Sequence, residues 1–187
     1  MPVYFVLFLA MLGAAVVFYA SALGASTLSR RPLPTLIGGR AADGLQTLHL
    51  GLAWINFGVS WLLYFNVYRI HVDMAALSDI AFLTFARGYT TRLPVVVLPY
   101  GAGALAAALA LWSAPTGVSR RALWGVATLW LLSVACTPWA AGAQDDMHDH
   151  GFSDAAFEQL QLAHLARSLC ISAAAGWSMW QCRRLRA

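Results

Sequence analysis

Five long apolar stretches, separated by shorter polar ones, set the pattern of this chain. They cover residues 3–24, 48–68, 94–112, 122–141 and 160–181. A helix needs about 20 mainly apolar residues to cross the ~30 Å hydrocarbon core of a bilayer, because it rises 1.5 Å per residue. The pattern therefore predicts an all-α, polytopic membrane helix bundle of five transmembrane helices, which forms a single integral membrane domain over residues 1–187.

The segment 69–93, between the second and third stretches, is too polar to span a bilayer and too apolar for a free loop. Its apolar run Ala81–Phe85 lies between Asp79 and Arg87. This pattern predicts a helix that lies at the membrane interface or folds back on the bundle. Aromatic residues near the predicted ends of the spans are expected to anchor the protein at the two membrane surfaces, and they include Tyr64, Tyr68, Tyr89, Tyr100, Trp139 and Trp177.

The composition excludes a water-soluble globular protein. Hydrophobic residues make up 60% of the chain and charged residues 11%, against roughly 45–50% and 25% in soluble domains. Every basic residue is an arginine. The arginines stand in short clusters beside apolar stretches and form no basic face, so we expect no nucleic-acid partner. The expected surroundings are the lipid bilayer.

The distribution of charge orients the predicted spans. Arginine accumulates on the cytoplasmic side of a bacterial inner membrane. The segment between the fourth and fifth stretches carries only acidic charges, whereas the segment 69–93 has arginines on the same predicted side and is the exception. The first stretch lacks the basic n-region of a signal peptide, which predicts an uncleaved span. We expect the N-terminus outside and the C-terminus in the cytoplasm, with these residues inside: Arg30, Arg31, Arg40, Arg120, Arg121, Arg183, Arg184 and Arg186.

One arginine falls inside a predicted span. Arg167 lies in the fifth stretch, with His164 three residues earlier on the same helical face. Charged groups in a span need a partner or a function. As a catalytic pair, His164 would accept a proton and Arg167 would stabilise an anionic ligand. Alternatively, Arg167 reaches the outer interface and pairs with Asp154 or Glu158. The candidates that would complete a binding pocket are Tyr100, Thr137, Asn56 and His49.

The segment 144–150 concentrates groups that bind metals. We expect it to be a loop outside the membrane, in which imidazoles and carboxylates suit Cu²⁺ or Zn²⁺. A solvated acidic loop without metal is the alternative. The same residues match the D-D-x-x-D pattern of Mg²⁺-dependent prenyl-diphosphate enzymes, but no second acidic motif accompanies it. His49 and His71 lie about 33 Å apart along a helix, so no haem is expected. The candidate metal ligands are Asp145, Asp146, His148, Asp149 and His150.

From residue 46 to residue 181, the chain resembles small bacterial four-helix membrane proteins related to the anthrone-oxygenase-like family. The resemblance rests on three features: the stretch 85–99, the proline-containing end of the fourth apolar stretch at 137–138, and the segment 151–160 followed by His164 and Arg167. It implies a four-helix core to which the first span is an addition. It also implies cofactor-free oxidation of polycyclic phenolic substrates, which a few members of the family catalyse.

Three classes of function follow from these features. In the first, the bundle holds a lipophilic or anionic small molecule in an intramembrane site near the periplasmic leaflet, with oxygenase-like chemistry. In the second, it is a non-catalytic accessory subunit of a larger membrane complex, or a homo-oligomer, that contacts its neighbours through small-residue faces. In the third, the acidic histidine segment binds a divalent metal on the periplasmic side.

Overall fold

The computed structural model describes residues 3–28, 33–90 and 94–184, and they are almost entirely helical. The all-α prediction is therefore confirmed. Within these ranges no strand forms beyond one isolated bridge between Ile37 and Ser113. The helices are α1 (Val3–Leu28), α2 (Gly39–Leu62), α3 (Arg69–Leu77), α4 (Asp79–Thr90), α5 (Pro94–Ala110), α6 (Arg120–His150) and α7 (Asp154–Arg184), with a π-helical turn η1 (Leu63–Val67) between α2 and α3.

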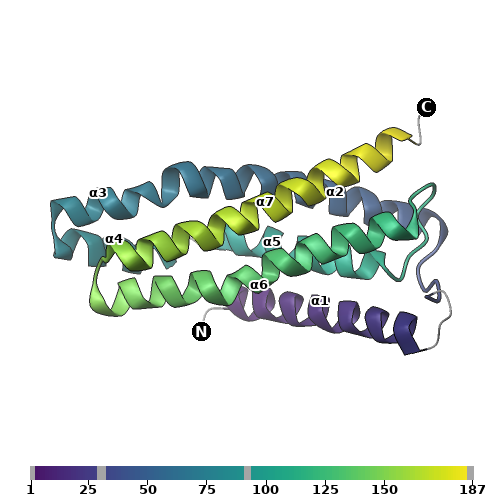
Figure 1. The fold of residues 1–187 in the computed structure, drawn as a ribbon, viewed down its shortest axis with the longest axis horizontal. Coiled ribbons are helices and arrows are strands. Elements are labelled where there is room, and N and C mark those ends of the chain that lie inside the picture. Colours follow the sequence, from purple (N-terminus) through teal and green to yellow (C-terminus); the bar gives the residue numbers. More distant parts are fainter. Residues whose placement is uncertain (1–2, 29–32, 91–93, 185–187) are drawn as a thin grey trace.

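The helices form an elongated bundle (Figure 1). Helices α6 and α7 run antiparallel along its whole length, and α2, η1 and α3 form a continuous rod beside them. Helix α5 packs against α1, α2 and α6. Helix α1 covers only the half of the bundle that holds the C-terminus, while α3 and α4 form the opposite end. The two halves of the bundle therefore contain different helices: α1 belongs to the half that holds the C-terminus, and α3 and α4 belong to the other.

Three helical segments are long and apolar enough to cross a membrane. They are Val3–Thr27, Gly39–Leu77 and Arg120–His150, and Val96–Ala110 is a shorter apolar helix. Helix α7 is more polar, but its polar side chains His164, Ser168 and Ser178 are buried in the bundle. These properties are those of a helical membrane protein.

The prediction of a loop at 144–150 is wrong, because α6 continues through these residues to His150. Its 31 residues extend over about 46 Å, more than the ~30 Å of a hydrocarbon core. Ala140, Ala143 and Met147 keep one face of this extension buried. Gly151, with φ 89°, ends the helix. The change from an apolar to a polar sequence near residue 142 therefore does not mark the end of the helix.

Residues 69–90 fold back on the bundle, which is one of the two arrangements predicted for the segment between the second and third stretches, and residues 91–93 lie outside the described structure. Helices α3 and α4 pack against each other, and α4 also contacts α6. The buried face of α4 includes Phe82 and Ala86. Phe82 contacts Phe152 of the α6–α7 turn, with ring centroids 5.6 Å apart. The end of the bundle away from α1 is therefore a packed four-helix unit.

The buried positions of the α2–α3 rod reveal why it contains a π-helical turn. From His49 they step by four and three residues, as an α-helix requires, and then by five residues from Leu63 to Tyr68. The Tyr68 amide donates to the Leu63 carbonyl, which is the five-residue bond of a π-turn. This extra residue keeps the later side chains on the inner face, so that the buried positions are His49, Ala53, Asn56, Ser60, Leu63, Tyr68 and His71.

Gly103 of α5 allows the close approach of Trp130 of α6, and this contact predicts a stability effect. A Cβ atom at residue 103 would lie 2.5 Å from Cη2 of Trp130, whereas a Cβ at Gly51 of α2 would meet nothing within 4 Å. We expect Gly103→Ala to destabilise the protein by about 1–3 kcal/mol, and Gly51→Ala to be neutral or stabilising by up to about 1 kcal/mol. Thermal unfolding in detergent measures both, and equal stability of the two variants would contradict the packing.

Candidate ligand cavity

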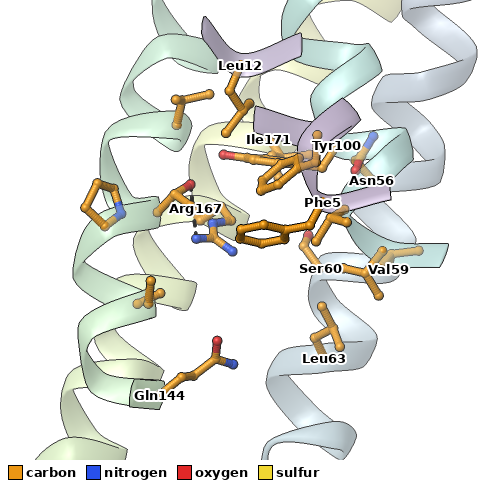
Figure 2. A pocket seen from close by; sticks show the side chains of 18 of the residues that line it. Phe5, Leu12, Asn56, Val59, Ser60, Leu63, Tyr100, Gln144, Arg167 and Ile171 are labelled. Atoms are coloured by element: carbon orange, nitrogen blue, oxygen red, sulfur yellow. Dashed lines mark hydrogen bonds between the residues drawn. The ribbon is translucent and has the colours of Figure 1, made fainter. Parts of the chain in front are cut away.

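A cavity of about 370 Å³ lies between α1, α2, α5, α6 and α7. Figure 2 shows Arg167, Tyr100 and Phe5 at the middle of its length, Leu12 and Ile171 toward one end, and Leu63 and Gln144 toward the other. The volume falls in the range of small-molecule sites. Most of the lining is aliphatic or aromatic, and the polar groups in it belong to Asn56, Ser60, Tyr68, Tyr89, Tyr100, Thr137, Gln144 and Arg167.

Among the residues that the structure describes, Arg167 is the one charged side chain that lines this cavity. Its Nη2 donates to Thr137 Oγ1 at 3.4 Å, and its guanidinium carbon lies 5.3 Å from the centroid of the Tyr100 ring. Its Nε is buried without a hydrogen-bond partner. No carboxylate of the described side chains lies within ion-pair distance of Arg167. The predicted pairing with Asp154 or Glu158 is wrong.

Hydrogen bonds hold the other polar groups of the cavity wall in place. Asn56 Nδ2 donates to the carbonyl oxygens of Leu52 at 2.7 Å and Pro99 at 3.0 Å, which fixes the amide between α2 and α5. The Tyr100 hydroxyl lies 2.9 Å from Ser133 Oγ of α6. Since these contacts span α2, α5 and α6, they preorganise the wall around Arg167.

Tyr68 connects the cavity to His164. The Tyr68 side chain lines the cavity, and its hydroxyl lies 3.4 Å from Nδ1 of His164. The opposite nitrogen of His164, Nε2, lies 3.0 Å from the Ser60 carbonyl oxygen. A carbonyl only accepts, so these partners assign the ring proton to Nε2 and leave Nδ1 free to accept from Tyr68. His164 is thus oriented with a lone pair toward Tyr68.

Tyr89 brings a second phenol to the same end of the cavity. Its hydroxyl is buried close to that of Tyr68, and it makes no hydrogen bond of good geometry among the described residues. Burial raises the pKa of the Tyr89 phenol, so the hydroxyl stays protonated at neutral pH and remains available as a donor. The ring is held by His71, whose centroid lies 5.6 Å away. A ligand at this end would meet two hydroxyl groups beside the guanidinium.

The structure gathers four of the six predicted site residues and separates the other two. Arg167, Tyr100, Thr137 and Asn56 line the same cavity. His164 lies behind Tyr68 and does not line it, which corrects the direct pair with Arg167. The prediction for His49 is wrong, because its Nε2 accepts a hydrogen bond from Trp130 Nε1 at 2.9 Å and it lines a separate void of about 10 Å³.

The predicted metal ligands do not come together. His150 Nδ1 lies 3.0 Å from Asp146 Oδ1, and His148 Nδ1 lies 3.6 Å from Asp149 Oδ1. Asp145 belongs to neither pair. Among the residues that the structure describes, no three His, Cys, Asp or Glu side chains are grouped as a metal site. The reason is the helical conformation, since successive residues of a helix point about 100° apart.

Sequence reasoning missed Tyr68, Tyr89 and Gln144 as cavity residues. The two tyrosines were expected to be interface anchors, but Tyr68 is only 3% exposed. No sequence signal could have found Tyr68, because a regular α-helix would turn it about 140° away from Leu63. Only the π-turn η1 returns it to the face of Asn56 and Ser60. Gln144 falls just beyond the predicted fourth span, where only the continuation of α6 brings it to the cavity.

Comparison of the chain with protein-family models, curated protein sequences and solved structures gives no match. The resemblance to the anthrone-oxygenase-like family therefore stays a prediction.

Proposed function

We propose that this chain is a five-span protein of the bacterial inner membrane that binds a lipophilic anion in the cavity around Arg167. One observation carries the proposal: a guanidinium without a carboxylate partner among the described residues, with a buried and unpaired Nε, faces a cavity whose lining is mostly apolar. An unneutralised cation inside a membrane bundle is costly. An anionic ligand would neutralise it and would form charge-assisted hydrogen bonds with it.

The proposed spans are α1, the α2 rod, α5, α6 and α7, with the N-terminus outside. The charges of the described residues support this orientation. Every acidic side chain except Asp43 lies on α3, α4 or the adjoining ends of α6 and α7, whereas Arg40, Arg120 and Arg121 lie at the opposite end. Arg69 of α3 and Arg87 of α4 are the exceptions, and the acidic side chains around them outnumber them. By the positive-inside rule, the end that holds α3 and α4 is periplasmic. The cavity then lies toward the periplasmic leaflet.

The lining favours an aromatic carboxylate or phenolate as the ligand. Phe5, Phe8, Tyr68, Tyr89 and Tyr100 supply ring faces and edges, which pack well against planar apolar bodies. Carboxylate and phenolate oxygens suit the planar guanidinium. A ligand with one anionic group and a ring body would therefore use the whole cavity.

Binding of 2-naphthoate tests this proposal. We expect the wild-type protein, in nanodiscs of zwitterionic phosphatidylcholine, to bind 2-naphthoate more tightly than the uncharged 2-naphthamide. Arg167→Gln removes the charge and should weaken naphthoate binding by about 10- to 100-fold, as for a lost charge-assisted contact of about 1.5–3 kcal/mol. Equilibrium dialysis measures the affinities.

Arg69→Gln is the matched control, because Arg69 is exposed and does not line the cavity. It should leave naphthoate binding unchanged. Equal affinity of the wild type for the acid and the amide, or full binding by Arg167→Gln, would overturn the proposal. If neither compound binds at all, the accessory-subunit interpretation is favoured instead.

The contact between Tyr68 and His164 favours a second candidate function, proton abstraction from a phenolic substrate. A ligand hydroxyl beside Tyr68 could pass its proton through the Tyr68 hydroxyl to Nδ1 of His164, while Arg167 holds the phenolate. Such a step would open the cofactor-free oxidation that the family resemblance implies, with O₂ as the oxidant.

The binding of 2-naphthol tests this step, because its neutral and anionic forms have different absorption spectra. At neutral pH we expect wild-type protein to bind it as the anion. His164→Gln should bind it as the neutral phenol, while 2-naphthoate, which needs no deprotonation, still binds. Neutral 2-naphthol bound to the wild type would contradict proton abstraction without affecting the first proposal.

A further inference from the structure

Helix α1 forms one wall of the cavity by apolar contacts alone. Phe5, Phe8, Leu9 and Leu12 from its N-terminal half line the cavity. The hydrogen bonds that tie α1 to the bundle through Tyr19 and Phe18 lie in its C-terminal half, where the Tyr19 hydroxyl meets Thr128 at 2.9 Å and the Phe18 carbonyl accepts from Trp112 at 3.2 Å.

The cavity reaches the outer surface of the bundle between α1 and α6. Leu9 of α1 is 44% exposed, and Pro138 and Ala141 of α6 are also exposed, yet all three line the cavity. Helix α1 packs mainly against α5 and touches α6 only sparingly. These apolar residues border an opening on a face that looks toward lipid in the proposed five-span arrangement.

We propose that the ligand of Arg167 enters from the bilayer through this opening, and that it is an amphiphile dissolved in the periplasmic leaflet. The inference rests on the proposed function, and it specifies the source of the ligand. An opening bordered by apolar residues disfavours a strongly hydrated anion, because the anion would have to lose its hydration shell before it reached the guanidinium. An amphiphile dissolved in the bilayer already has its apolar part out of water, and lateral diffusion within the leaflet brings it to the opening.

The alternative route leads from water at the α3–α4 end. There the cavity is bordered by Leu63, Tyr68, Tyr89 and Gln144. Tyr68 is 3% exposed and is held between the cavity and His164. Entry past Tyr68 requires a buried aromatic ring to move, whereas entry between α1 and α6 requires only a displacement of aliphatic side chains.

Association kinetics in nanodiscs distinguish the two routes. Alkylation of the probe should speed binding if the bilayer is the source, because four added CH₂ groups raise membrane partitioning on the order of 100-fold. We expect 6-butyl-2-naphthoate to associate at least about tenfold faster than 2-naphthoate at equal aqueous concentration. Energy transfer from protein tryptophan to the naphthalene ring reports binding in a stopped-flow instrument. An equal or slower rate for the butyl compound overturns bilayer entry.

A bulky side chain in the opening supplies the second test. Ala141→Trp narrows it from the α6 side, whereas Ala135→Trp places the same bulk at an exposed position that does not line the cavity. We expect Ala141→Trp to slow both association and dissociation by about tenfold, with less change in Kd, and Ala135→Trp to change neither rate.

The failure of this inference is distinguishable from that of the proposed function. If wild-type protein binds naphthoate through Arg167 and Ala141→Trp leaves both rates unchanged, bilayer entry is wrong and anion binding stands. If Ala141→Trp abolishes binding by filling the cavity, the comparison of the two probes on the wild type decides. If the wild type binds neither probe, both proposals fall.

Discussion

Replacing Arg167 by methionine is expected to raise the stability of the ligand-free protein by about 1–4 kcal/mol. A guanidinium with a buried, unpaired Nε and no carboxylate partner among the described residues does not repay its loss of hydration. Methionine keeps a similar apolar stem without the charge. Thermal unfolding in zwitterionic nanodiscs measures the change, and the exposed Arg69→Met is the control that should show little effect.

Addition of ligand should narrow or reverse the difference in stability between the two proteins. At 100 times its Kd for the wild type, 2-naphthoate is expected to stabilise the wild type by about 2.7 kcal/mol and Arg167→Met by no more than about 1.4 kcal/mol, because its affinity for the variant is at least about tenfold lower. A strongly destabilised Arg167→Met would instead mean that the contacts with Thr137 and Tyr100 give Arg167 a structural role. That outcome would contradict the interpretation of Arg167 as a ligand-binding residue that is kept at the expense of stability.

The existence of the helices could be predicted from the sequence, whereas their ends could not. Apolar runs locate the parts of α1, α2, α5 and α6 that avoid water. They do not predict that a helix continues into a polar segment such as 142–150, where the buried side chains of Ala143 and Met147 keep α6 packed against the bundle. Hydropathy measures contact with lipid, and a helix that leaves the membrane while still packed on a neighbour has no hydropathy signal at its real end.

The residues of the candidate site could be predicted where a charged or polar side chain interrupts an apolar stretch of the sequence. Arg167 stands out as a charge within a span, and Thr137, Tyr100 and Asn56 are polar groups in neighbouring spans. His49 meets the same criterion but pairs with Trp130 instead. Which polar groups share a cavity depends on contacts between helices far apart in the chain, such as the contact between Tyr68 and His164. A single sequence does not contain that information.

Deletion of Asn66 is expected to be tolerated, unlike deletion of one residue from a regular helix. Asn66 is an exposed residue of the π-turn η1. Its removal shortens the step from Leu63 to Tyr68 from five residues to four, which an ordinary α-helix accommodates with Tyr68 and His71 still facing inward. We expect a loss of no more than about 2 kcal/mol.

Deletion of Leu169, an exposed residue of α7, is the matched control. No π-turn can absorb it, so the buried residues Ile171, Ala174 and Ser178 would rotate by about 100° relative to His164. We expect a loss above about 4 kcal/mol, or no folded protein. Size-exclusion chromatography and thermal unfolding compare the two deletions. Similar behaviour would contradict the assignment of the π-turn as the site of one surplus residue.

The starting level of α1 has a consequence for the depth of the bound charge. Helix α1 begins midway along the bundle (Figure 1), and its first turns border the cavity at the level of Arg167 (Figure 2). If Val3 marks the outer edge of the hydrocarbon, the guanidinium lies within about two turns of the phospholipid headgroups. An amphiphile could then keep its anionic group near the depth it already occupies among the lipids. The protein would select such a molecule by its shape and charge without drawing that charge toward the centre of the bilayer.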